Sequence, residues 1–418
     1  MRSSSLEENS VPRQDTSVEA ALDSTPTGKR SKLSELRSTF GPAWIVMIAD
    51  VDAASIVTAA QDGASYGYGL VWFLLVLAIP LFLIQEAAGR IGIATGQGLG
   101  EVIRRNYSKS AAIVMSMPMA ITDVLSYVAE YAGIAIGFEL LGVPVFLSLP
   151  VVYILHLLLV WKKKYVTVEK FLIAISAVFI LSYIASLVVR GLPTTSVASS
   201  FVMFRTTPHF VYLLAASAGA VVMPFMLFYQ ASATAEKKSK FLWASRFETL
   251  VGAVVSEVIM VVILMATVGV DPNSFNLNSV AALTKGLSSV ADGYSPILFG
   301  VGMIAASFLA LVVISLASAW AVTEATGLGR NKFFWIYLLE SLPAVAVPMF
   351  FPNLFSLLLN SMVAFTFVLI GPGIILGVIA SNKKIMGANV SSMRMRIGYW
   401  ASLTAIVGFG VFAVLTIF

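Results

Sequence analysis

Two short stretches of this sequence bring together residue types that can bind a cation. Residues 50–55, Asp-Val-Asp-Ala-Ala-Ser, place Asp52 and Ser55 three positions apart inside an otherwise apolar segment. The second stretch is a run of small residues that ends in Met223 and Pro224. A carboxylate, a hydroxyl and free backbone carbonyls make an oxygen-rich site, and a thioether favours transition metals over Mg²⁺ or Ca²⁺. Met223 taken alone favours packing, since methionine fills gaps in many cores. Its position beside the break and Pro224 makes a ligand role equally compatible with the sequence.

Both stretches are expected to interrupt membrane-spanning helices. Pro224 removes a helical hydrogen bond, and ionisable groups such as Asp52 are costly inside a membrane. The two interruptions fall five predicted spans apart, which favours two inverted repeats with a binding site between the breaks at the membrane midplane. The alternative is a small-residue helix contact together with an ordinary proline kink. We predict a metal site whose ligands are Asp52, Ser55, the carbonyl near Ala220, and Met223.

The elements that must hold these residues are helices in a membrane. The chain has 418 residues, of which 58% are hydrophobic and 12% charged, with a mean hydropathy of +0.89. A soluble domain carries about a quarter charged residues, so this composition excludes a soluble enzyme, a disordered chain and a fibrous protein. The sequence contains no cysteine, which excludes disulfides and thiolate metal sites. With only two histidines, no Walker loop and no His-Glu-x-x-His motif, it also lacks the residues for ATP hydrolysis or a zinc hydrolase.

We predict an all-α polytopic membrane protein with about eleven transmembrane helices, because long apolar runs cross a membrane as helices. Residues 1–38 are rich in polar residues and predict a disordered cytoplasmic tail, followed by a transporter domain over residues 39–418. The first repeat is expected over about residues 40–190, the second over about 209–381, and an extra helix over 397–417. The predicted spans are 40–61, 68–92, 110–138, 145–161, 169–189, 210–232, 247–269, 294–323, 333–350, 355–380 and 397–417.

The distribution of lysine and arginine predicts the orientation of these spans. Nearly all of these residues fall in the tail and in alternate loops, and the opposite loops hold only Arg190, Arg205 and Lys285. The N-terminus is therefore expected in the cytoplasm and the C-terminus outside. The net charge of +5 is attributed to this topology and not to nucleic-acid binding. The compact loops and the absence of an apolar leader are typical of a protein of the bacterial inner membrane.

Other ionisable residues inside the predicted spans are assigned mainly structural roles. Glu86 and Arg90 are four residues apart and can pair on one helix face. His156 is expected to be packed or interfacial. Glu257 and Glu340 lie in spans without a nearby motif, so a structural role is favoured over a functional one.

Several motifs resemble the Nramp family of divalent-metal transporters. They are Gly-Pro-Ala-Trp at 41–44, Gln-Asp-Gly-Ala-Ser-Tyr-Gly-Tyr at 61–68, residues 85–98 with Gly-Ile-Ala-Thr-Gly, Val-Met-Pro at 222–224 and Lys-Ile-Met-Gly at 384–387. The resemblance runs from about residue 40 to the end. It implies a LeuT-type fold with two inverted five-helix repeats, broken first and sixth helices, and transport by alternating access. It implies no enzymatic activity and no cofactor beyond the transported ion.

The sequence departs from the family pattern at positions that matter for ion binding and proton transfer. The family's Asp-Pro-Gly-Asn is Asp-Ala-Ala-Ser at residues 52–55, so surrounding residues must impose the unwinding. Two family histidines correspond to Phe225 and Gln230, and an aspartate corresponds to Tyr127, whereas the family glutamate is retained as Glu130. Proton relays in transporters are chains of Asp, Glu and His. This pattern resembles the Nramp-related magnesium transporters, although Met223 is the soft ligand of the transition-metal branch.

The function predicted from these residues is import of Mg²⁺ and Mn²⁺ by a secondary transporter without proton coupling. Glu130 is assigned to the vestibule or a relay, together with Asp50, Tyr127, Phe225 and Gln230. One alternative is a proton-coupled Mn²⁺ or Fe²⁺ importer, and another is a non-transporting receptor or scaffold on a transporter fold. The expected partners are divalent metal ions and the lipid bilayer, with no nucleic acid, and a monomer is expected.

Overall fold

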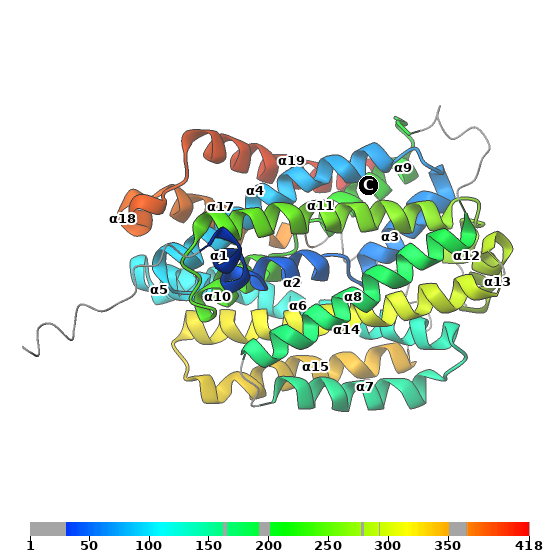
Figure 1. The fold of residues 1–418 in the computed structure, drawn as a ribbon, viewed down its shortest axis with the longest axis horizontal. Coiled ribbons are helices and arrows are strands. Elements are labelled where there is room, and N and C mark those ends of the chain that lie inside the picture. Colours follow the sequence, from blue (N-terminus) through cyan, green and yellow to red (C-terminus); the bar gives the residue numbers. More distant parts are fainter. Residues whose placement is uncertain are drawn as a thin grey trace, which may run out of the picture.

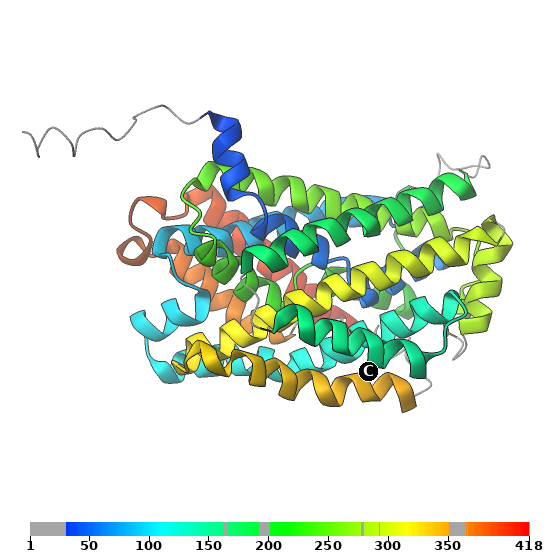
Figure 2. The same cartoon turned by 60° about the horizontal axis from the view of Figure 1, so that its bottom comes forward.

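The computed structural model of the chain describes residues 31–161, 165–191, 201–276, 280–291, 293–350, 365 and 367–417. Within these ranges every regular element is helical, and the long helices form one bundle (Figures 1 and 2). The α-helices are α1 Lys32–Thr39, α2 Pro42–Ala49, α3 Ala53–Tyr66, α4 Val71–Thr95, α5 Leu99–Asn106, α6 Lys109–Leu140, α7 Val145–Val160, α8 Tyr165–Arg190, α9 Pro208–Ala220, α10 Pro224–Glu236, α11 Leu242–Thr267, α12 Asn273–Asn276, α13 Val280–Ala291, α14 Tyr294–Thr326, α15 Phe333–Phe350, α17 Ile370–Ser381, α18 Lys383–Met386 and α19 Met393–Ile417.

The helices agree with the predicted spans. Eight helical segments of the described chain are long and apolar enough to cross a membrane, and the bent pair α2–α3 makes a ninth. The shorter apolar helices α7 and α17 fall on the two predicted spans that remain. The prediction of an all-α polytopic membrane protein is therefore confirmed. The first part of the predicted span 355–380, up to residue 364, lies outside the described residues.

Two of the spans are interrupted, as the sequence predicts. α2 ends at Ala49 and α3 begins at Ala53, and these two helices are bent by 52°. α9 ends at Ala220 and α10 begins at Pro224. In Figure 1, α2 and α10 lie toward the end that carries α5 and α18, whereas α3 and α9 lie toward the end that carries α12 and α13. Both breaks therefore fall partway along the bundle, and their chains run in opposite directions, as inverted repeats require.

The helix α1 corrects the prediction that the chain is disordered up to residue 38. Its N-cap is Ser31, whose hydroxyl accepts a hydrogen bond from the Ser34 N–H at 3.3 Å. The indole N–H of Trp243 donates to Glu35 Oε2 at 2.7 Å, so α1 is docked on the start of α11. A cap and a tertiary contact order this segment although its composition is polar. Residues 1–30, the rest of the predicted tail, lie outside the described residues.

Small residues let α6 approach both α14 and the first break. A Cβ added to Gly137 would lie 2.8 Å from the carbonyl oxygen of Gly300 in α14. A Cβ added to Gly133 would lie 2.3 Å from the Cβ of Ala53, the first residue of α3. Larger side chains at these positions would push the helices apart. The close approach places Glu130, one turn before Gly133, at the break between α2 and α3.

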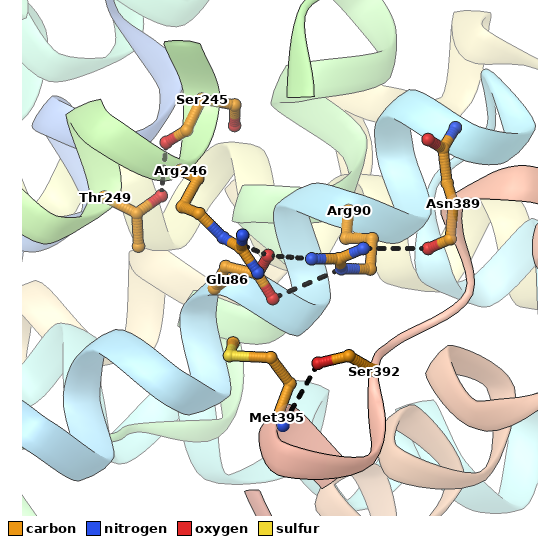
Figure 3. Close-up of polar contacts among 8 residues, drawn as sticks. All are labelled: Glu86, Arg90, Ser245, Arg246, Thr249, Asn389, Ser392 and Met395. Atoms are coloured by element: carbon orange, nitrogen blue, oxygen red, sulfur yellow. Dashed lines mark hydrogen bonds and ion pairs between the residues drawn. The ribbon is translucent and has the colours of Figure 1, made fainter. Parts of the chain in front are cut away.

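A buried ion-pair network joins α4 to α11 and to the segment before α19 (Figure 3). Glu86 forms an ion pair with Arg90, four residues later, and accepts a hydrogen bond from Arg246 Nε at 3.1 Å. Arg90 Nη1 also donates to the carbonyl oxygen of Asn389 at 3.0 Å. The prediction that Glu86 and Arg90 pair is therefore confirmed. The pair also connects α4 with α11 and with the segment before α19.

Candidate metal centre

The first break holds Asp52 at the N-terminus of α3. Asp52 Oδ1 accepts a hydrogen bond from the Ser55 N–H at 2.7 Å, which is an N-cap interaction. The Ser55 hydroxyl donates to the carbonyl oxygen of Asp50 at 2.9 Å. Asp52 is 2% exposed and Ser55 is 1% exposed. The cap fixes the orientation of the Asp52 carboxylate, whose two oxygens together have lone pairs for more than one partner.

Glu130 of α6 stabilises this break from outside the broken helix. The Ala53 N–H donates to Glu130 Oε2 at 3.2 Å. In an unbroken helix the same N–H would donate to the carbonyl of Ala49. Glu130 is fully buried, and its carboxyl group lies within electrostatic reach of Asp52. A side chain from another helix thus satisfies a backbone donor at the break, although residues 53 and 54 are alanines and not helix breakers.

The second break follows from its own sequence. Pro224 is the first residue of α10 and has no N–H, so the carbonyl of Ala220 lacks its usual helical donor. The Met223 N–H donates to Met226 Sδ at 3.3 Å, which satisfies a backbone donor at the start of α10. Ala220 is 1% exposed and Met223 is fully buried. The carbonyl of Ala220 and the thioether of Met223 are therefore held in the protein interior next to a helix interruption.

The two breaks are brought together by crossed contacts between the broken helices. α2 packs against α10, and α3 packs against α9. α6 and α14 each contact both broken helices. The helices that carry the four predicted ligands therefore meet partway along the bundle. Within the described ranges, no three Asp, Glu or His side chains converge closely enough to hold a metal ion. A metal centre here would need carboxylate, hydroxyl, carbonyl, thioether and water ligands together.

Tyr127, a predicted relay residue, belongs to a separate buried network. Its hydroxyl donates to Ser315 Oγ of α14 at 3.0 Å. The same Ser315 hydroxyl lies 2.8 Å from Nε2 of His156, whose Nδ1 lies 2.9 Å from the Tyr131 hydroxyl. His156 is therefore packed and hydrogen-bonded, which is one of the two environments predicted for it. Through Ser315, Tyr127 links α6 to α14 and α7.

Phe225 and Gln230, the other positions where the sequence departs from the family pattern, are buried within α10. Phe225 is 1% exposed and Gln230 is fully buried. Gln230 packs against α4, because a Cβ added to Gly89 would lie 2.7 Å from its Nε2. Neither side chain is titratable, so α10 carries no proton acceptor at these two positions.

Two polar contacts near the breaks were not predicted from the sequence. The Ser217 hydroxyl donates to Asp62 Oδ2 at 2.8 Å and joins α9 to α3 on the side away from α5. The Ser256 hydroxyl of α11 donates to Asp50 Oδ2 at 3.2 Å. Ser217 lies in the small-residue run that precedes the second break, and Asp62 lies in the motif at residues 61–68, but neither pattern indicates that the two side chains meet. Ser256 has no distinguishing neighbour other than Glu257.

A polar cleft of about 540 Å³ opens between α4, α5, α10 and α14. Its lining includes Gln97, Glu101, Ser232 and Glu324. The Ser232 hydroxyl donates to Glu324 Oε1 at 2.8 Å. Since Ser232 is on α10, eight residues after Pro224, the cleft lies on the α5 side of the second break. The lining holds three carboxylates, Glu101, Glu236 and Glu324, and two cationic side chains, Arg104 and Lys238, so the cleft is hydrophilic and of mixed charge.

Comparison with known proteins places this arrangement in a family. Residues 43–416 match the family model described as natural resistance-associated macrophage protein-like, Nramp. The chain belongs to the Nramp family. A relative named divalent metal cation transporter MntH, from Verminephrobacter eiseniae, is 25% identical over 410 residues, which cover 94% of this chain and 92% of that protein. The protein of the same name from Bacillus subtilis is 25% identical over 419 residues, with 96% of each covered.

Solved structures share the fold of this Nramp-family chain. A single-site mutant of the Eremococcus coleocola manganese transporter superposes with a TM-score of 0.79 at 17% identity, covering 93% of this chain and 88% of that one. MhsT in complex with L-phenylalanine superposes with a TM-score of 0.59 at 13% identity, covering 93% and 99%. The prediction of a LeuT-type fold with broken first and sixth helices is therefore confirmed.

Proposed function

We propose that this Nramp-family chain is a secondary transporter that imports the divalent metal ions Mg²⁺ and Mn²⁺ by alternating access, without proton coupling. The observation that carries the proposal is the buried Asp52 carboxylate at an interrupted helix, opposite a second interruption at Ala220 and Met223. The names of the MntH relatives and of the manganese transporter support a divalent metal as the substrate.

The substrate is expected to bind through a mixed set of ligands. Asp52 supplies the charge, Ser55 a hydroxyl oxygen, Ala220 a carbonyl oxygen and Met223 a thioether. Since no other acidic or imidazole side chains complete a metal cage in the described chain, water must fill part of the coordination shell. Mg²⁺ keeps several of its waters when bound to proteins, so a sparse site suits it. The thioether is expected to favour Mn²⁺ over Mg²⁺.

The residues at the proton-relay positions support transport without proton coupling. Phe225, Gln230 and Tyr127 occupy positions where the family has two histidines and an aspartate. The membrane potential alone drives a divalent cation inward with about 4.6 kcal/mol per 100 mV, from about 2.3 per unit charge. The positive-inside distribution of lysine and arginine supports an orientation in which α5 and α18 face the cytoplasm, so the cleft at Glu324 is the exit.

Proton-coupled Mn²⁺ import is the second candidate function; the name of the Eremococcus coleocola manganese transporter favours Mn²⁺ as the substrate, and the buried carboxylates of Asp52 and Glu130 favour a proton carrier at the break. In that case Asp52 and Glu130 carry the proton. The test is uptake into proteoliposomes under an applied potassium-diffusion potential, with Mg²⁺-, Mn²⁺- and pH-sensitive dyes in parallel. The proposal predicts entry of both metals with no change of internal pH. Mn²⁺ entry with acidification and without Mg²⁺ entry would overturn it in favour of the second candidate.

A further inference from the structure

The break between α2 and α3 has a second carboxylate, Asp50, whose environment the metal centre does not explain. Asp50 Oδ2 accepts a hydrogen bond from Ser256, while Oδ1 has no hydrogen-bond partner within the described chain. Asp50 is 3% exposed. It lies within electrostatic reach of two further carboxylates, Glu257 and Asp52. A buried carboxylate among like charges needs a compensating positive charge or a proton.

Glu257 lacks hydrogen-bond partners even more completely than Asp50. It is 1% exposed, and neither of its carboxylate oxygens has a hydrogen-bond partner within the described chain. None of the ion pairs found among the described residues involves Glu257 or Asp50. Buried polar groups in native proteins are normally satisfied, so a fully unpartnered carboxylate requires a proton, an ion or another partner that is not part of the chain.

The packing of α11 explains why these groups meet at the break. On one side, Gly252 lies against α2, because a Cβ there would come 2.7 Å from Met47 Cγ. On the other side, the Thr267 hydroxyl donates to the Ala60 carbonyl of α3 at 2.9 Å. α11 thus contacts both halves of the broken helix, and Ser256 and Glu257 lie between these two contacts. These two contacts place Ser256 in hydrogen-bond contact with Asp50, and Glu257 within electrostatic reach of it.

We propose that Asp50, Ser256 and Glu257 form a second cation site, distinct from the centre at Asp52, for a hard cation such as Na⁺ or a second divalent ion. Two carboxylates and a hydroxyl provide only oxygen ligands, which hard cations prefer. The bound cation compensates the buried charge of Asp50 and Glu257, and it stabilises the orientation of the break on which the Asp52 site depends. The inference does not require that the Asp52 site transports Mg²⁺ or lacks proton coupling.

The test measures the thermal unfolding midpoint of purified transporter while NaCl replaces choline chloride at constant ionic strength, and then while MgCl₂ or MnCl₂ is added. The variants are Glu257→Gln and Ser256→Ala. The matched control is Glu248→Gln, because Glu248 is also a buried glutamate of α11, but its Oε1 accepts hydrogen bonds from the Gly41 N–H at 2.6 Å and the Trp44 N–H at 2.9 Å. A further variant, Asp52→Asn, removes the charge of the Asp52 centre and leaves Asp50, Ser256 and Glu257 unchanged, so it distinguishes the two sites.

We expect a saturable cation-dependent rise of the midpoint in the wild type, in Glu248→Gln and in Asp52→Asn. In Glu257→Gln the cation concentration at half-effect should increase about tenfold or more, since a charged ligand is removed. A response to Na⁺ identifies a monovalent site, and a response in Asp52→Asn to divalent ions alone identifies a second divalent site. An unchanged response in Glu257→Gln, or a response that disappears entirely in Asp52→Asn, would overturn the inference.

A direct binding measurement covers the case in which a variant unfolds too easily for thermal analysis. Scintillation-proximity binding of ²²Na⁺ or ⁵⁴Mn²⁺ to wild type and to Ser256→Ala needs only folded protein at low temperature. The proposal predicts weaker binding by Ser256→Ala, and equal binding would contradict it. Uptake by Asp52→Asn is measured separately, so failure of the transport proposal is distinguishable from failure of the second cation site.

Discussion

The two helix breaks are maintained in different ways. The α9–α10 break follows from a local covalent cause, since Pro224 has no N–H to donate to Ala220. The α2–α3 break has no proline, and a carboxylate from α6 accepts the hydrogen bond of the Ala53 N–H. A proline alone does not interrupt a helix in this chain, since Pro80 and Pro118 lie inside the continuous helices α4 and α6. Pro224 therefore favours the second break locally, whereas the first break depends on tertiary packing throughout. This difference predicts that the α2–α3 break is the more sensitive to substitutions in neighbouring helices.

The largest effect is expected at Asp52, which combines a helix cap with the charge of the proposed ligand. Asp52→Ala should abolish metal uptake in proteoliposomes and, by loss of the cap, destabilise α3 by about 1 kcal/mol. Asp52→Asn retains an oxygen that can accept from the Ser55 N–H but loses the charge. Both variants should therefore fail in uptake, and only the alanine variant should lose stability. Near-normal Mn²⁺ uptake by Asp52→Ala would remove the site proposal.

The next largest effect is expected at Glu130 and tests whether tertiary contacts maintain the first break. Glu130→Ala leaves the buried Ala53 N–H without its acceptor, at a cost of about 1–3 kcal/mol. We expect uptake to fall about tenfold, since 1.4 kcal/mol corresponds to a factor of ten. Glu130→Gln keeps an acceptor and should retain most of the uptake. If glutamine proves as harmful as alanine, the charge itself is required, which favours the proton-coupled alternative.

A smaller effect is expected at Pro224, which tests the local cause of the second break. Pro224→Ala supplies an N–H that can pair with the Ala220 carbonyl, and removal of an interior proline favours a continuous helix by up to about 3 kcal/mol. The thermal midpoint should rise while metal uptake falls. Pro118→Ala is the control, since this proline lies at an exposed position within α6, away from either break. An unchanged uptake in Pro224→Ala would show that the free carbonyl is dispensable.

The smallest effect is expected at Met223 and is a change of selectivity. Met223→Ala should weaken Mn²⁺ and Cd²⁺ uptake several-fold, whereas Mg²⁺ uptake should change little, because a thioether interacts with softer metals. Competition of Cd²⁺ against Mg²⁺ uptake measures this directly. Met119→Ala in α6 removes another fully buried methionine and controls for lost packing. Equal losses for all three metals would show that the sulfur of Met223 only packs.

The helical membrane class, the span positions and the location of both breaks could be predicted from the sequence. Apolar length and composition are local properties, and the cost of exposing backbone groups to lipid leaves helices as the solution. Pro224 and the cluster at Asp52 also stand out locally, so both interruptions were predictable. Local composition gave a wrong prediction for α1. This polar segment was predicted to be disordered, but its Ser31 cap and its contact with Trp243 order it.

The side chains that surround the breaks could not be predicted from the sequence, because they come from distant parts of the chain. Glu130 is 77 residues from Ala53, and Ser256 is 206 residues from Asp50, so no local pattern reports either contact. Both depend on close helix approaches at Gly133 and Gly252, where an added Cβ would lie within 3 Å of another helix. The sequence alone assigned Glu257 a structural role because no motif accompanies it. The surroundings of Glu257 depend on the packing of α11 against both halves of the broken helix, because burial and electrostatic coupling are properties of the packed chain.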